Sequence, residues 1–264
     1  MSRSTAFDPF EHPICFATPT RIAHSTWMGH VPFAMLLVDM VSPGVLVELG
    51  TYAGVSYCAF CQAVKELKIA SRCFGVDTWQ GDTQSGFYGT DILNELKEFH
   101  DPLYGSFSQL IRGTFDEAIE RFEPASVDLL HIDGCHTYEA VKHDFETWRP
   151  KMSRRGVVLF HDIAVREGDY GAWRLWEEVS AAYPHFHFDH AYGLGLAVVG
   201  TDGPPALLDL CYAPRAEQVP YVASPASFPS CSKAEPTPPE APWISARWPG
   251  ATLAERWIIW YAVM

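Results

Sequence analysis

The stretch VDLLHIDGCHTYEAVKHDF (residues 127–145) places an acidic residue at the end of an apolar run. The run VDLLHI has the composition of a buried strand, and a helical pattern follows from Tyr138 to Trp148. A carboxylate at the end of a buried strand, here Asp133, is costly to desolvate unless something binds it. The stretch therefore predicts a strand–helix unit with a polar site at the strand end. A helix cap or turn is the alternative, because Asp and Gly are both turn residues.

The same strand–helix unit recurs along the chain in both directions from this stretch. The predicted strands are residues 45–49, 72–77, 108–113, 127–133 and 156–162, and the helices between and after them are residues 54–67, 91–100, 115–122, 138–148 and 172–183. Strands separated by helices predict right-handed crossovers and a mostly parallel sheet. HFHFDH (185–190) and GLGLAVVG (193–200) leave no room for a helix between them, so they predict an antiparallel pair.

The predicted fold class is therefore α/β: a doubly wound, Rossmann-like, seven-stranded and mostly parallel sheet with a terminal antiparallel strand pair and helices on both faces. We expect an N-terminal extension over residues 1–26 and the main domain over residues 27–200, beginning with a helix at 27–43. Residues 201–264 are rich in Pro and predict a tail that is extended or wraps the surface. The apolar end of that tail, residues 253–264, favours docking on the domain or on a partner subunit, and so a homo-oligomer.

Composition narrows the class of protein. The formal net charge of -13 would repel a nucleic-acid backbone, so DNA or RNA is not an expected partner. Seven scattered Cys are typical of reduced thiols, and the two in CxxC spacing, Cys58 and Cys61, lie inside a predicted helix. The first residues show no secretory signal, and no apolar segment is long enough to span a membrane. We expect a soluble, cytoplasmic protein that does not bind membranes.

The first two strands indicate a nucleoside site. The stretch VLVELGTYAGVSY places Glu48 and Gly50 at the end of one strand and Gly54 at the start of its helix, where glycine permits a tight turn and free amides face a ligand. The spacing is not the GxGxxG of a pyrophosphate-binding loop. Asp77 ends the second strand, where it can accept hydrogen bonds from a ribose diol. The alternatives are that Glu48 caps a helix and that Asp77 starts an Asx-turn with Thr78.

The last two parallel strands indicate a metal site. Asp133 and Asp162 end neighbouring strands, and in a doubly wound sheet such strand ends face one crevice. Two converging carboxylates suit a hard divalent cation, with His161 as a third candidate ligand. Imidazole is a poor ligand for Mg²⁺ and favours Mn²⁺, Fe²⁺ or Zn²⁺. Alternatively, His161 points into the core and no metal binds.

Four motifs resemble the class I S-adenosylmethionine-dependent methyltransferases. They are the Glu-x-Gly-x-x-x-Gly pattern from Glu48, GVDTW (75–79), IDGCHTYEAV with DFETW (132–148), and GVVLFHDI (156–163). The pattern is more narrowly similar to the branch with macrolide-sugar and rhamnosyl O-methyltransferases and cephalosporin-hydroxylase-like proteins. The resemblance covers residues 27–200 and includes the antiparallel strand pair.

The resemblance implies roles for single residues. Gly50 and Gly54 would lie under the methionine part of the cofactor, Glu48 near its amino group, and Asp77 on the ribose hydroxyls. The implied cofactor-binding residues are Glu48, Gly50, Thr51, Gly54, Asp77, Thr78, Thr114, Phe115 and Asp133. The implied metal ligands are Asp133, His161 and Asp162, for a divalent cation such as Mg²⁺ or Mn²⁺. His136 would be the general base, with Asp133 as the second catalytic residue; otherwise His136 is a helix-start residue bonded to a local carbonyl.

The expected function is methyl transfer from S-adenosylmethionine to a hydroxyl of a small-molecule or sugar-containing acceptor. Two other functions stay open. One is a protein that binds the cofactor without catalysis. The other is a metal-dependent hydrolase or oxygenase that uses the Asp and His residues, in which case the Glu48–Gly54 loop and Asp77 would have no role.

Overall fold

The fold comes from a computed structural model, which describes residues 11–23, 25–82, 84 and 86–213. All of these residues belong to one compact unit. The predicted apolar end of the chain, residues 253–264, lies outside them, as does most of the Pro-rich tail.

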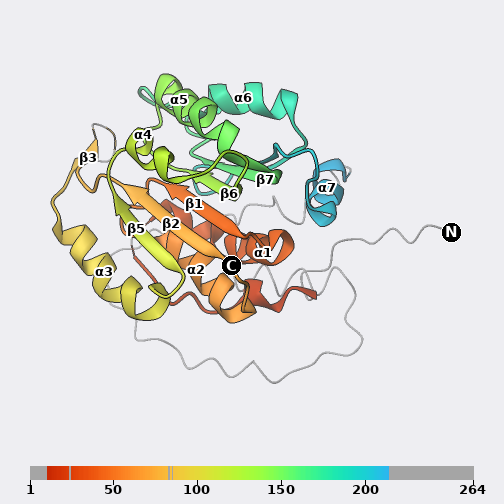
Figure 1. Ribbon diagram of the computed structural model, residues 1–264. Coiled ribbons are helices and arrows are strands. Elements are labelled where there is room, and N and C mark those ends of the chain that lie inside the picture. Colours follow the sequence, from red (N-terminus) through yellow and green to blue (C-terminus); the bar gives the residue numbers. More distant parts are fainter. Residues whose placement is uncertain (1–10, 24, 83, 85, 214–264) are drawn as a thin grey trace. The chain divides into compact units, whose positions relative to one another are not determined.

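A seven-stranded sheet with the order β5-β2-β1-β6-β7-β9-β8 forms the centre of the molecule (Figure 1). Its strands are β1 (Val45–Leu49), β2 (Arg72–Asp77), β5 (Ser108–Arg112), β6 (Val127–Ile132), β7 (Met152–His161), β8 (His185–Phe188) and β9 (Leu194–Val198). The first five run parallel, whereas β9 is antiparallel to both β7 and β8. The predicted sheet with its antiparallel hairpin is confirmed. A separate short hairpin, β3 (Gly81–Asp82) with β4 (Gly86–Phe87), lies in the loop after β2 and was not predicted.

Helices cover both faces of the sheet (Figure 1). On one face lie α4 (Phe115–Ala118), continued by η4 (Ile119–Arg121), then α5 (Tyr138–Trp148) and α6 (Ala172–Ala182); on the other lie α1 (Val31–Val41), α2 (Val55–Leu67) and α3 (Asp91–Tyr104). The remaining elements are η2 (Pro13–Phe16), η3 (Thr26–His30), η5 (Arg149–Lys151) and α7 (Pro205–Tyr212). Helix starts follow the sequence: Thr114 and Glu117 form a capping box at α4, and the Thr137 side chain accepts a hydrogen bond from Ala140 N at α5.

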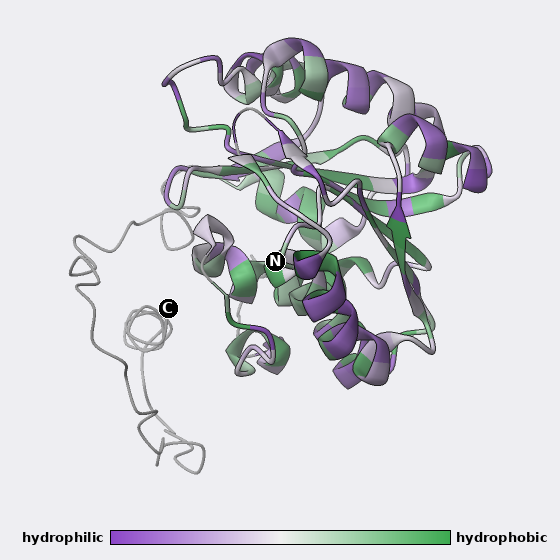
Figure 2. Ribbon diagram, turned by 90° about the vertical axis from the view of Figure 1, so that its left-hand side faces the viewer, coloured by the Kyte–Doolittle hydropathy of each residue, from purple (hydrophilic) through white to green (hydrophobic). Residues whose placement is uncertain are grey.

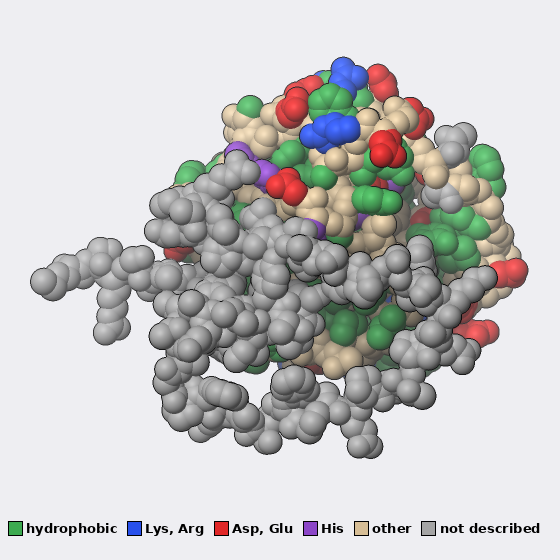
Figure 3. Space-filling model, turned by 180° about the vertical axis from the view of Figure 1, so that it is seen from behind, with side chains coloured by type: hydrophobic (Ala, Val, Ile, Leu, Met, Phe, Trp, Pro, Cys, Tyr) green, Lys and Arg blue, Asp and Glu red, His purple; other side chains and the backbone are tan. Residues whose placement is uncertain are grey.

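The core lies between the sheet and these helices. Every residue of β1 is buried, as is typical of a parallel strand covered on both faces. Figure 2 shows the hydrophobic residues concentrated in the sheet and on the inward sides of the helices, with hydrophilic residues outward. From behind (Figure 3), acidic and basic side chains lie next to one another at the upper edge, and the uncovered part of this view shows no continuous basic patch.

Three boundaries differ from the sequence prediction. The strand predicted at 156–162 begins earlier, at Met152, because β7 continues through the polar residues that precede the apolar run. The helix predicted at 27–43 is a 3-10 helix up to His30 and an α-helix from Val31. Residues 205–212, which lie in the predicted extended tail, form helix α7 and bury Leu207 and Leu210. Pro205 suits the first helical position, and α7 packs against β8 and α1.

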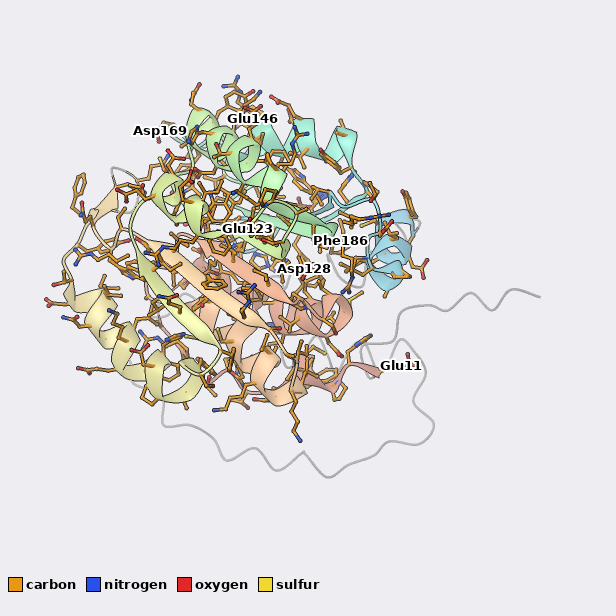
Figure 4. The ribbon with its side chains drawn as sticks, viewed as in Figure 1. Glu11, Glu123, Asp128, Glu146, Asp169 and Phe186 are labelled. Atoms are coloured by element: carbon orange, nitrogen blue, oxygen red, sulfur yellow. The ribbon has the colours of Figure 1, made fainter. Side chains whose placement is uncertain are left out.

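The two ends of β6 carry acids with different roles. Asp128, labelled in Figure 4, lies near the amino end, where its carboxylate accepts hydrogen bonds from Gly44 N (2.8 Å), Val45 N (3.2 Å) and Ser153 Oγ (2.6 Å). These bonds tie β1, β6 and β7 together at that end. Asp133, just past the carboxyl end, faces a cavity instead.

Candidate active site

A cavity of about 690 Å³ lies at the carboxyl ends of the parallel strands. Its wall includes residues at or just after the ends of five strands. They are Gly50 and Tyr52 (β1), Asp77 and Thr78 (β2), Thr114 and Phe115 (β5), Asp133, Gly134, Cys135 and His136 (β6), and His161 and Asp162 (β7). The β3–β4 region, the start of η3, and two loops add Ser25, Thr26, Trp27, Gly81, Asp82, Gln84, Tyr88, Tyr170 and Tyr192. In open α/β sheets this end of the strands is where ligands bind.

Two glycines of the loop after β1 allow close packing beside the cavity. Gly50 has a φ of 91°, and a Cβ placed there would lie 2.0 Å from the Asp133 carbonyl oxygen. Only glycine lets the loops after β1 and β6 approach this closely. Gly54, with a φ of 78°, is the N-cap of α2, and a Cβ there would meet Leu96 Cδ1 at 2.5 Å. The Gly50 and Gly54 pattern is therefore required by packing as well as by any ligand.

The carboxylate of Asp77 is held in the cavity wall by backbone donors. Its Oδ2 accepts a hydrogen bond from Tyr52 N (2.8 Å), and its Oδ1 accepts one from Trp79 N (2.7 Å). Burial raises the pKa of this carboxyl, and these backbone donors oppose the shift. A carboxylate offers about four acceptor positions, so these donors leave acceptor capacity in a residue that lines the cavity. The Asx-turn alternative is thus also correct in part, but its partner is Trp79 N and not Thr78.

Not every predicted cofactor residue reaches the cavity. Thr78, Thr114 and Phe115 line it, whereas Thr51 and Gly54 do not. Glu48 was predicted near the cofactor's amino group, but it is fully buried inside the sheet. The parallel register pairs Glu48 with His131, and Glu48 Oε2 lies 2.8 Å from His131 Nδ1. The Glu48 carboxylate is therefore paired with His131 and does not line the cavity, and its place near the cofactor's amino group stays a prediction.

The predicted reactive residues do come together. His136 Nε2 lies 2.8 Å from Asp162 Oδ2 and 3.2 Å from Asp133 Oδ1. His161 Nδ1 lies 3.2 Å from Asp133 Oδ1 and 3.3 Å from Asp162 Oδ1. Two carboxylates and two imidazoles from the ends of β6 and β7 thus form one cluster in the cavity wall.

The charges in this cluster depend on one another. Burial by itself lowers the pKa of His136, but the hydrogen bonds to Asp133 and Asp162 outweigh it and raise this pKa to about 10. Burial also lowers the pKa of His161, but the charge of Asp133 outweighs this effect and raises the pKa to about 9. Burial would raise the pKa of Asp133, yet the neighbouring imidazoles hold it well below its usual range. In the absence of any ligand, both imidazoles carry a proton at neutral pH.

The backbone and ring of His136 are held by residues that we did not predict. Its N–H donates to Gln84 Oε1 (2.7 Å), and its carbonyl oxygen accepts from Gly171 N (2.7 Å). Its ring stacks on Tyr170, with centroids 5.3 Å apart and planes at 8°. Gln84 Nε2 also donates to Asp169 Oδ1 (2.8 Å), so the segment after β3 is tied to the loop after β7. A Gln or Tyr in a loop carries no sequence signal for such contacts.

The cavity wall contains strained backbone. Tyr52, Asp162 and Tyr192 have φ angles of 45°, 59° and 68°, which few residues other than Gly, Asn and Asp adopt. Such residues cost about 1–3 kcal/mol each and cluster at functional sites. At Asp162 the unusual φ directs the carboxylate toward His136 and away from the continuation of β7.

The cluster also fits a metal ion. Asp133, His136 and Asp162 each offer a ligand atom, and these atoms all lie within 4.8 Å of one another. Among buried side-chain atoms of the described residues, His136 Nδ1 and His161 Nε2 have no hydrogen-bond partner. Mixed oxygen and nitrogen donors suit Mn²⁺, Fe²⁺ or Zn²⁺ better than Mg²⁺. The structure thus adds His136 to the predicted ligands, with His161 next to them.

Comparisons with known proteins agree with this geometry. Residues 47–163 match the family model of a methyltransferase domain. The chain is 50% identical over 179 residues to y4gI, an uncharacterized protein of Sinorhizobium fredii. That alignment covers 68% of this chain and 20% of the relative, so this chain spans about a fifth of the relative's length. Among the described residues, no helix is both long and apolar enough to cross a membrane.

Solved structures share the fold. A Staphylococcus aureus protein provisionally named a caffeoyl-CoA O-methyltransferase is 15% identical, with a TM-score of 0.51, over 72% of this chain and 90% of that one. The O-methyltransferase TomG from Streptomyces achromogenes, solved in complex with S-adenosylmethionine, is 14% identical, with a TM-score of 0.51, over 69% of this chain and 83% of that one. Residues 47–163 thus resemble a methyltransferase domain, and the chain shares the fold of these O-methyltransferase structures.

Proposed function

We propose that this chain is an S-adenosylmethionine-dependent O-methyltransferase that acts on a hydroxyl of a small or sugar-containing acceptor. One observation carries the proposal: Asp77 and the Asp133–His136–Asp162 cluster line the same cavity. The first suits a ribose diol, and the second suits a hydroxyl that must lose a proton. The sugar preference rests on the resemblance to sugar O-methyltransferases alone.

The lining residues would have separate roles in cofactor binding and in methyl transfer. Asp77, Thr78, Thr114 and Phe115 would bind the nucleoside part, and the Gly50 loop would lie under the methionine part. When bound, S-adenosylmethionine supplies a methyl group on a sulfonium. The acceptor oxygen forms a bond to that methyl carbon as the carbon–sulfur bond breaks, and the electron pair stays on sulfur. Alignment of these atoms in the cavity supplies much of the rate, an effect that can reach about 7–11 kcal/mol.

His136 is proposed as the proton acceptor. Its pKa of about 10 means that the ring is protonated before any ligand binds. A positive charge brought into the cavity, such as a sulfonium, lowers this pKa by Coulomb repulsion and favours the neutral ring. The neutral ring can then take the hydroxyl proton at Nε2, with Asp162 at 2.8 Å to stabilise the resulting cation.

A divalent cation at Asp133 and Asp162 would lower the pKa of the acceptor hydroxyl and orient it. His136 Nε2 cannot bind such a cation and take a proton at the same time. If His161 completes the metal site, His136→Gln should keep Mn²⁺ binding and lose turnover. If His136 is itself a ligand, the same variant should lose Mn²⁺ binding as well, and titration calorimetry with Mn²⁺ separates the two cases.

The test of the function is titration calorimetry of S-adenosylmethionine into chelator-treated protein, followed by turnover with a panel of hydroxylated acceptors. Micromolar binding with methyl transfer supports the proposal. Binding without transfer to any acceptor, even with Mn²⁺ or Mg²⁺, indicates a cofactor-binding protein. Absence of binding with and without metal contradicts the proposal.

The Asp and His cluster also favours one second candidate, a metal-dependent hydrolase or oxygenase. That function predicts turnover without S-adenosylmethionine and its loss on chelation. It leaves Asp77, which backbone N–H groups hold in the cavity wall, without a role.

A further inference from the structure

The wall of the cavity is acidic. Four aspartates line it: Asp77, Asp82, Asp133 and Asp162. Among the described lining residues there is no Lys or Arg. The two imidazoles of the wall are already engaged by carboxylates, at 2.8–3.3 Å. A negatively charged ligand group would therefore meet no Lys or Arg side chain on this part of the wall.

The negative charge acts on other residues of the wall. Burial raises the pKa of Tyr88, which also lines the cavity, and the charges of Asp77 and Asp82 raise it further. These two aspartates thus act on a neighbouring part of the wall. An entering phosphate would meet the same field.

Flat aromatic surfaces form much of the remaining wall. Tyr52 packs edge-on against Tyr88, with centroids 5.0 Å apart, and Tyr170 lies parallel to the reactive His136. Tyr52 and Tyr192 are 44% and 54% exposed, so both present ring surface at the mouth. Aromatic faces pack well against other rings and against cations, and they add no negative charge beyond their weak quadrupole.

We propose that the acceptor is a hydroxylated ring compound that carries no phosphate, so that it enters free and not as a coenzyme A thioester or a nucleotide-linked sugar. The inference rests on the proposed methyltransferase function and narrows its substrate class. A phosphate ester carries a charge of about -1.5 to -2 at neutral pH. Charged ligands bind where the field complements them, and like charges disfavour both encounter and binding.

The first experiment compares matched ligands on protein saturated with S-adenosylhomocysteine. The probes are catechol and methyl glucoside, each against its own phosphate ester, measured by titration or ligand-observed NMR. We expect each parent compound to bind at least about tenfold more tightly than its ester at low salt. The difference should shrink as salt rises, because exposed charges are screened over about 10 Å at 0.1 M. Esters that bind as tightly as their parents would overturn the proposal.

A second experiment needs no acceptor. Cationic and anionic nitroxides of the same size are added to labelled protein, and relaxation of the amides of Gly81, Gly134 and His136 reports the local potential. We expect the cation to relax these amides several-fold more than the anion. Asp82→Asn should reduce that ratio, whereas Asp91→Asn, an exposed acid in the first turn of α3 and outside the cavity wall, should not. A stronger effect of the anion contradicts the inference.

The two proposals fail in different ways. If the protein does not bind S-adenosylmethionine or S-adenosylhomocysteine, the methyltransferase function is wrong, and the nitroxide result still measures the charge of the cavity. If the cofactor binds and the phosphate esters bind best, the function stands and the acceptor class is wrong.

Discussion

The two halves of the cavity are built differently. The half after β1, β2 and β5 uses mostly backbone: Gly50 permits close packing, and Asp77 is fixed by two backbone N–H groups. The half after β6 and β7 uses titratable side chains, which hold one another through contacts of 2.8–3.3 Å. The first half suits binding of a constant cofactor. The second suits chemistry, because its charges respond to what enters the cavity.

This difference predicts that substitutions in the reactive half reduce turnover and spare cofactor binding. His136→Ala removes the proposed proton acceptor, so we expect kcat to fall about 10²–10⁴-fold, the typical contribution of general base catalysis. The affinity for S-adenosylhomocysteine should change less than threefold, as measured by calorimetry. His143→Ala is the control, since His143 is a half-exposed histidine on α5 bonded to Asp116. If the two variants were equally active, His136 would not be the proton acceptor.

Asp144 lies between the two halves and should couple pH to stability. A Cβ on Gly134 would meet both Phe115 and Asp144, and the Asp144 carboxyl is buried, which raises its pKa to about 7. The folded protein thus holds a proton that the unfolded chain releases near pH 4. Stability from this group is therefore complete below about pH 4 and is lost as the pH rises toward 7.

Asp144→Asn removes this dependence. One pKa unit corresponds to about 1.4 kcal/mol, so we expect the variant to be more stable at pH 8 by about 2–4 kcal/mol in urea unfolding. At pH 4 the two proteins should be nearly equal. Asp91→Asn, at an exposed acid in the first turn of α3, should leave the pH slope unchanged. An unchanged slope in Asp144→Asn would show that its carboxyl is ionised in the folded state.

In the cofactor half, by contrast, substitutions should weaken cofactor binding and leave turnover nearly unchanged. Asp77→Ala removes the charged acceptor, and hydrogen bonds to charged groups contribute about 1.5–3 kcal/mol. We expect the dissociation constant of S-adenosylhomocysteine to rise about 10- to 100-fold, with kcat at saturation within threefold of the original. Asp77→Asn, which keeps one acceptor, should fall between. A loss of kcat without weaker binding would place Asp77 in the chemistry and erase the contrast.

The smallest expected effect concerns Gln84, which joins the segment after β3 to the reactive half. Gln84→Ala removes the acceptor for His136 N and the donor to Asp169. We expect kcat to fall about three- to tenfold, about the value of one net hydrogen bond. Hydrogen exchange of the His136 amide should speed up in the same variant. Gln80→Ala, at an exposed position of the same loop, serves as the control and should change neither quantity.

Much of the sheet could be predicted because its strands are continuous apolar runs and its helices alternate with them. β1, β2 and β6 end within one residue of the predicted positions. The start of β7 was missed because Ser153, Arg154 and Arg155 are polar, yet they continue the strand at its exposed end. α7 was missed because Pro and Gly precede it, and its two buried leucines form too short a pattern to recognise.

The sequence by itself determined which residues end the strands, because a polar residue after an apolar run is visible in any reading. It therefore predicted Asp77, Asp133 and Asp162 in one cavity, since parallel strands bring their carboxyl ends together. Only the tertiary structure decided the orientations. The β1–β6 register buries Glu48 against His131, the positive φ of Asp162 directs its carboxylate to His136, and two distant loops bring Gln84 and Tyr170 onto that histidine. Side-chain direction depends on neighbours far along the chain, and no local pattern records them.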